Sequence, residues 1–221
     1  MRKVQFAPEE HYHIFNRGNN KQPIFQNNKD RIRFLFLLLH NQAPVHFINL
    51  SRQVSYFVKH RVFNISDAEV NKIATKRYVE LENFVLMPNH FHMTVFEKEE
   101  GGISRYMQRI LNGYTKYFNT KYQKVGHLFQ GPFKAVHVED NRQLLYLSAY
   151  IHRNPRELQD WNNKEISFPW SSYQDYAEKN RWGNLLKSEV ILSQFSDKTE
   201  YKNFVETSGA KEMNKELEID C

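Results

Sequence analysis

The sequence predicts an α+β protein built on a ferredoxin-like antiparallel sheet. Segments with the apolar patterns of strands and helices follow one another in the order strand, helix, strand, strand, helix, strand, and a further helix comes after them. The two middle strands are separated only by a Pro-Asn turn, which favours an antiparallel hairpin. We therefore expect helices on one face of the sheet, an extra helix after the fourth strand, and a tail that wraps the core.

The first strand, the first helix and an insertion account for the N-terminal part of the chain. Polar and apolar side chains alternate over residues 11–17 before a Gly-Asn-Asn loop, so this segment is expected to be a strand. Apolar residues at helical spacing predict a helix over residues 28–40. Residues 41–74 carry weaker helical signals and several basic side chains, and we interpret them as an insertion. Its basic face is either solvated, which is the default, or in contact with DNA.

Three further elements complete the core after the central hairpin. A helix is expected over residues 103–121, and a fourth strand, interrupted by a Gly-Pro pair, over residues 127–138. A last core helix is expected over residues 142–154, because an Asp-Asn pair caps its start and a proline follows its end. The tail after Trp161 contains aromatic anchors and a final helix near residues 198–205.

Composition indicates a globular protein with a nucleic-acid partner. The chain has 221 residues, of which 40% are hydrophobic, a formal net charge of +6 and a pI of about 9.2. The only cysteine is Cys221, so no disulfide within the chain and no thiolate metal cluster is expected, which fits a cytoplasmic setting. No secretory segment is recognised at the N-terminus, and the longest apolar run, residues 34–39, is too short to span a membrane.

The central hairpin carries the first candidate site residues. It is formed by residues 77–87 and by a strand that begins with His90 and His92. Side chains alternate between the two faces of a strand, so both imidazoles point the same way and the residues between them point toward the core. Two neighbouring imidazoles provide half of a metal site, although a solvent-facing polar strand is the simpler alternative. The two histidines of the first strand, His11 and His13, lie near this pair only if that strand is its neighbour, and half-exposed polar positions are the preferred interpretation.

The helix over residues 142–154 offers the rest of a site. Tyr150 and Asn154 are four residues apart and therefore lie one turn apart on one face. Two imidazoles and the Asn154 carbonyl oxygen suit Mg²⁺ or Mn²⁺, and such an ion would present a phosphate to the Tyr150 hydroxyl. A packed core tyrosine is the default for each of the twelve tyrosines, and Tyr114 and Tyr117 remain rivals as the nucleophile.

Several basic residues are candidates for DNA contact. They lie at the end of the first strand, on the helix over residues 103–121, and near the proposed tyrosine. Basic residues mixed with tyrosines on a helix suit single-stranded nucleic acid, and a solvated face of an ordinary amphipathic helix is compatible with that function. The candidates are Arg17, Arg105, Arg109, Lys116, Lys134 and Arg153.

Three motifs together resemble one family. Residues 87–92 (MPNHFH) resemble the His-hydrophobic-His motif of the single-tyrosine HUH transposases, and residues 150–155 (YIHRNP) resemble the tyrosine helix of their REP-associated branch. Residues 126–134 and 12–18 are similar to further segments of that branch. Each motif is short, but they occur in the family's order. Two departures are the long insertion at 41–74 and Phe129 where the family usually has tryptophan.

The resemblance implies a metal-dependent enzyme that cleaves and joins single-stranded DNA. His90, His92 and Asn154 would bind the metal, and Tyr150 would become linked to the 5′-phosphate and leave a 3′-hydroxyl. The expected substrate contains hairpin repeats beside a short guide sequence. Residues 1–160 would form the catalytic domain and residues 161–221 an extension packed on it, with a frayed end from Ser208 onward. Monomer and homodimer both remain open.

Three other functions are weighed against this one. A relaxase or replication initiator shares the chemistry, but the chain has no phosphate-binding loop of helicase type. A non-catalytic regulator that binds hairpin DNA or RNA would not need all four site residues. A phosphohydrolase would use the metal with water in place of tyrosine.

Overall fold

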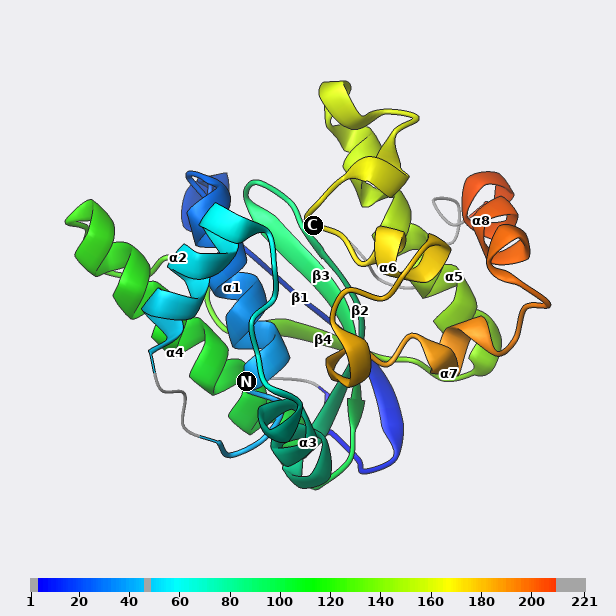
Figure 1. Cartoon of the computed structure of the whole chain (residues 1–221), viewed down its shortest axis with the longest axis horizontal. Coiled ribbons are helices and arrows are strands. Elements are labelled where there is room, and N and C mark those ends of the chain that lie inside the picture. The colour runs from blue at the N-terminus through cyan, green and yellow to red at the C-terminus, as the bar shows by residue number, and fades with distance from the viewer. Residues whose placement is uncertain (1–3, 46–48, 210–221) are drawn as a thin grey trace.

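The computed structural model describes residues 4–45 and 49–209. Its centre is a four-stranded sheet in the order β2-β3-β1-β4, in which every neighbouring pair is antiparallel. The strands are β1 (Glu10–Arg17), β2 (Val79–Leu86), β3 (His90–Glu97) and β4 (Lys134–His137). This order confirms the predicted ferredoxin-like α+β fold, with β1 in the interior of the sheet (Figure 1).

Two long helices cover one face of the sheet. They are α1 (Asn28–His40) and α4 (Gly102–Tyr122), which agree closely with the predicted ranges. The Phe34 ring on α1 lies 5.1 Å from the Phe91 ring on β3 and 5.0 Å from the Tyr114 ring on α4. Burial of these aromatic rings between helices and sheet is the main source of stability on this side.

The opposite face is covered by α5 (Asn141–Arg153) and by the tail. The tail adds α6 (Tyr173–Ala177), α7 (Glu189–Leu192) and α8 (Lys198–Thr207), the last of which matches the predicted final helix. The buried His152 on α5 joins these layers, because its Nδ1 lies 2.7 Å from the Tyr201 hydroxyl and its Nε2 lies 2.8 Å from the Ser172 hydroxyl. Figure 1 shows α5 running across the sheet toward the β2–β3 turn.

The fourth strand is shorter than predicted. Only Lys134–His137 pair with β1, and residues 127–131 form a loop. Gly131 has a φ of 72°, and Pro132 has no N–H to donate, so a regular ladder cannot pass through them. The loop instead crosses the end of β1, where the Gln130 N–H donates to the Arg17 carbonyl.

The insertion forms two helices, of which the first packs beside α1 and the second contacts the tail at Gly183–Leu185. They are α2 (Leu50–His60) and α3 (Asp67–Lys76), and α3 begins with a capping box between Ser66 and Glu69. Phe57 and Phe63 pack edge-on against the Phe36 ring of α1. The helix α2 therefore extends the layer formed by α1 and α4 and lies on the side of the sheet away from α5. Within residues 4–45 and 49–209, no helix has both the length and the apolar character needed to cross a membrane.

A buried carboxylate joins the start of α1 to the end of α4. Asp30 accepts hydrogen bonds from the Lys121 amine at 2.6 Å, the Tyr122 hydroxyl at 2.6 Å and the Tyr117 hydroxyl at 2.8 Å. Burial alone would raise the pKa of Asp30, but these donors outweigh it and hold the pKa below its usual value. The ionised form is thus the one that stabilises the fold.

We expect Asp30→Ala to lower the free energy of unfolding by about 3 kcal/mol, because it leaves the Lys121 charge partly buried without its partner. Because the pKa of Asp30 is depressed in the folded state, its contribution is complete above about pH 4 and is lost as the pH falls further. Urea unfolding at pH 7 and pH 3 measures both effects. The difference in free energy of unfolding between Asp30→Ala and wild type should be smaller at pH 3 than at pH 7. Lys29→Ala, at the exposed neighbouring position, should change stability by less than about 0.5 kcal/mol.

Candidate active site

The predicted histidine pair lies on the sheet face that α5 covers. His90 and His92 are both buried, and their rings are 5.2 Å apart at nearly a right angle. Phe91, between them, points to the opposite face and contacts Phe34. The alternation of β3 therefore places both imidazoles beneath α5, as the sequence predicts.

Asn154 completes a cluster with His90. The His90 Nε2 atom lies 3.1 Å from the Asn154 Oδ1 atom. On the other side of the ring, His90 Nδ1 lies 2.7 Å from Asn89 Oδ1, and the Asn89 amide donates to the Lys21 carbonyl. The Asn89 oxygen must therefore accept the His90 Nδ1 proton, which leaves a lone pair on Nε2 directed at Asn154.

His13 also belongs to this cluster. Its Nε2 lies 2.9 Å from His92 Nδ1, and the two rings stack 5.1 Å apart. The only trace of this contact in the sequence is the polar alternation of the first strand. Because β1 and β3 are far apart in the chain, the contact depends on the strand order. His13 holds the His92 ring in orientation and, since its Nε2 faces that ring, does not point to Asn154.

Tyr150 lies directly over these histidines. Its ring packs edge-on against His92, with centroids 5.4 Å apart, and lies 6.3 Å from the His13 ring. The side chain is 7% exposed. Tyr150 and Asn154 reach the same cluster because they are one turn apart on α5 and the 3-10 turn that follows it.

The rival tyrosines lie elsewhere. The Tyr114 hydroxyl donates to the Ile24 carbonyl at 2.6 Å, and the Tyr117 hydroxyl donates to Asp30. Both are on α4, which covers the other face of the sheet. Their hydroxyls have structural partners, which leaves Tyr150 as the tyrosine beside the histidine pair.

Burial keeps the cluster histidines neutral. Loss of hydration lowers the pKa of His90 to about 4 and that of His13 to about 3. Burial, together with the neighbouring His13, His90 and Arg17, lowers the pKa of His92 well below its usual value. Neutral imidazoles are the form that binds a metal ion. No group of three or more His, Cys, Asp or Glu side chains able to hold a metal occurs among the described residues.

The predicted DNA-contacting cations fall into two groups. Arg17 lies opposite His90 in the β1–β3 register, and the Lys134 amine lies 5.6 Å from the Phe15 ring on the same face. Lys116 lies on the exposed side of α4. These three are placed where DNA could reach them.

The other three cations have contacts within the fold. Arg105 pairs with Glu99 at 3.4 Å, far along α4 from the histidines. Arg109 donates to the Ala43 carbonyl at 2.6 Å and to the Val45 carbonyl at 2.8 Å, which anchors that segment to α4. Arg153 donates to the Ser208 carbonyl. These contacts give the three arginines structural functions that sequence patterns do not show.

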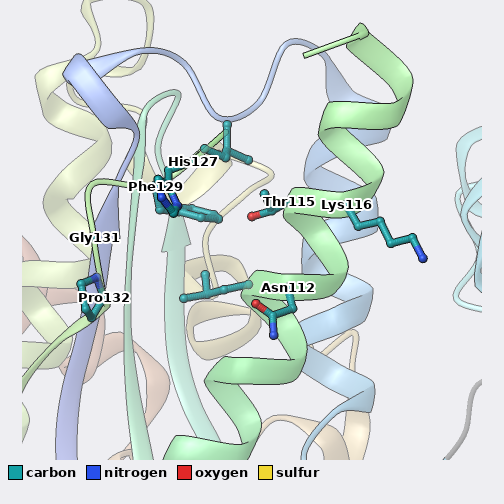
Figure 2. Close-up of a pocket in the computed structure, with 9 residues that line it drawn as sticks. Asn112, Thr115, Lys116, His127, Phe129, Gly131 and Pro132 are labelled. Atoms are coloured by element: carbon teal, nitrogen blue, oxygen red, sulfur yellow. The ribbon is translucent and has the colours of Figure 1, made fainter. Parts of the chain in front are cut away.

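A groove runs between α4 and the loop over residues 127–131. Its volume is about 590 Å³ (Figure 2). Thr115 and Asn112 line it from α4, Phe129 and Pro132 line it from the loop, and the Lys116 side chain extends away from the loop. The Asn19 N–H donates to the Leu128 carbonyl, so this loop is attached to the end of β1 that carries Arg17.

Comparison with known proteins places this chain in a family. A family model described as "Transposase IS200 like" matches residues 39–154, slightly more than half of the chain, and the match ends at Asn154. The chain therefore belongs to the IS200-like transposase family and is a transposase. A solved structure of a REP-associated tyrosine transposase bound to a REP hairpin has the same fold, with a TM-score of 0.50 and 15% identity over 80% of this chain and 85% of that chain. No curated protein matches the sequence.

Proposed function

We propose that this transposase is a metal-dependent endonuclease and strand transferase for single-stranded DNA, with Tyr150 as its nucleophile. One observation carries the proposal: the Tyr150 ring packs on His92, beside the point where His90 Nε2 and Asn154 Oδ1 face each other at 3.1 Å. A tyrosine and a set of neutral ligands, brought together from three separate elements, are the parts that such a reaction requires.

The residues present fit a divalent metal ion. With its Nδ1 proton directed at Asn89, His90 presents the Nε2 lone pair 3.1 Å from the Asn154 amide oxygen, and a cation could be bound by both atoms. The contact between His13 Nε2 and His92 Nδ1 fixes the orientation of the His92 ring, and His92 would be the third ligand. Two nitrogens and one oxygen suit Mg²⁺ or Mn²⁺ with positions left for phosphate. Such an ion would polarise the phosphodiester and offset the charge that develops on it.

In the proposed reaction, the Tyr150 oxygen forms a bond to the scissile phosphorus and the bond from phosphorus to the 3′ oxygen breaks. The phenol loses its proton, and the departing 3′ oxygen gains one. The products are a 5′-phosphotyrosine and a free 3′-hydroxyl. Because the new ester is similar in energy to the old one, a 3′-hydroxyl from another strand can reverse the step and join there. The pocket formed by His92 and His13 holds the tyrosine in place.

The proposed substrate is single-stranded DNA that contains a hairpin. The solved transposase with the same fold is bound to a REP hairpin, which supports a similar substrate for this chain. Arg17 and Lys134 beside the cluster, and Lys116 along the groove in Figure 2, are the cations proposed to contact phosphates.

A labelling experiment tests the proposal. The wild-type protein is incubated with Mn²⁺ and hairpin DNA labelled on the 3′ side of the cleavage point, and is then run on a denaturing protein gel. We expect a labelled protein band, with the label on the peptide that contains Tyr150 by mass spectrometry. Cleavage without a labelled band would indicate a hydrolase that uses water, and binding without cleavage would indicate a regulator. Either result would overturn the proposal.

A further inference from the structure

A second cavity borders the candidate active site and has aromatic walls. It is about 450 Å³ in volume and lies between the first turn of α1, the Pro88 turn and the 3-10 segments that follow α5. Trp161, Phe168 and Trp170 line it, together with Arg31. We call these four residues and Pro88 the aromatic pocket. Figure 1 shows the β2–β3 turn and the segment after α5 at the same end of the sheet.

Arg31 contacts aromatic rings of the fold but no side-chain or backbone acceptor among the described residues. Its guanidinium lies 5.7 Å from the Phe25 ring and 5.8 Å from the Trp170 ring. Across the described parts of the chain its side chain makes no hydrogen bond or ion pair, and its Nε is buried without a partner. Arginine stays charged even though burial lowers its pKa. A guanidinium held between aromatic rings, with a buried Nε that has no acceptor, is suited to donate to a ligand that enters the pocket.

Two chain segments connect the pocket to the candidate active site. Pro88 comes two residues before His90, and Asn154 begins the 3-10 turn that ends at Glu157 on the pocket rim. A single strand bound at Asn154 and His90 could therefore extend along these segments to the pocket.

The charges around the pocket favour binding of the base of a nucleotide over binding of its phosphate. The exposed carboxylate of Asp160 lies on the rim and would repel a phosphate. A base offers a π-face to the tryptophans, acceptors to Arg31 and N–H donors to the Asp160 carboxylate. We propose that the aromatic pocket binds one unpaired nucleobase of the DNA strand held at the active site. This inference rests on the proposed function for its substrate class.

Tryptophan fluorescence tests the proposal directly. Two of the three tryptophans line the pocket, and Trp182 is buried elsewhere, so Trp182→Phe leaves only the two reporters. The probes are a single-stranded 20-mer of mixed sequence and a 20-mer of abasic sugar-phosphate, added in EDTA so that cleavage is not required. We expect quenching by the first probe and none by the second. Equal quenching by both would show phosphate binding and overturn the proposal.

Substitutions locate the effect. Arg31→Gln should weaken binding of the mixed 20-mer about tenfold by fluorescence anisotropy, whereas Lys29→Gln, which removes an exposed charge from the same turn, should weaken it less than about threefold. Trp161→Leu, on the half-exposed rim, should lose most of the quenching without altering α1. An equal loss of affinity for the 20-mer in Arg31→Gln and Lys29→Gln would contradict specific binding in the aromatic pocket. Base-dependent quenching without a tyrosine adduct would support nucleobase binding in the pocket and contradict the proposed Tyr150 chemistry. A tyrosine adduct without quenching would support the chemistry and contradict nucleobase binding.

Discussion

Tyr150→Phe is expected to eliminate the covalent protein–DNA product and to slow cleavage of hairpin DNA by at least about a thousandfold. The substitution removes one oxygen atom and preserves the ring that packs on His92 and His13. The fold and the affinity for DNA should therefore be unchanged. Single-turnover cleavage in Mn²⁺ measures the rate, and anisotropy in EDTA measures the binding.

The matched control for this experiment is Tyr146→Phe. Tyr146 lies one turn earlier on α5, is half-buried and packs 5.4 Å from the Phe204 ring, away from the histidines. Loss of the Tyr146 hydroxyl should leave the cleavage rate within about twofold of the wild-type rate. An adduct that persists in Tyr150→Phe would show that another residue attacks the phosphate.

His90→Ala is expected to weaken Mn²⁺ binding by about a hundredfold or more and to reduce cleavage to a similar extent. The change removes the Nε2 lone pair that faces Asn154 and leaves two of the three proposed ligands. Isothermal titration calorimetry without DNA measures the affinity independently of catalysis. His60→Ala, at an exposed position on α2, is the control and should leave the affinity unchanged. Equal Mn²⁺ affinity in wild type and His90→Ala would place the metal elsewhere.

Local patterns predicted the parts of the site that depend on one element. Alternation along β3 places His90 and His92 on one face, and helical spacing places Tyr150 and Asn154 one turn apart. The order of the elements likewise predicted the sheet. These features depend on the spacing of residues that are close in the chain, and this spacing can be read from one sequence. The chemical functions assigned to the four residues stay predictions until the experiments above are done.

Features that depend on long-range packing were not predictable. His13 joins the cluster only because β1 pairs with β3, and polar alternation alone favours an exposed strand. Arg109 resembles a DNA-binding residue on its helix, yet its guanidinium bonds backbone carbonyls. Arg31 is one of several basic residues near the start of α1, and its isolation becomes visible only when the tail places Trp170 beside it. Ser208 bonds Arg153, and the rest of the end predicted to be frayed, from residue 210, lies outside the described residues.

The interior position of β1 has a consequence for how the protein is made. His13 meets His92 across 79 residues, and His90 meets Asn154 across another 64. Such distant contacts form slowly, and the contact between His90 and Asn154 cannot form during synthesis before Asn154 has left the ribosome. A nascent chain therefore cannot assemble the cluster, and the capacity to cut DNA would arise only when α5 closes over the finished sheet.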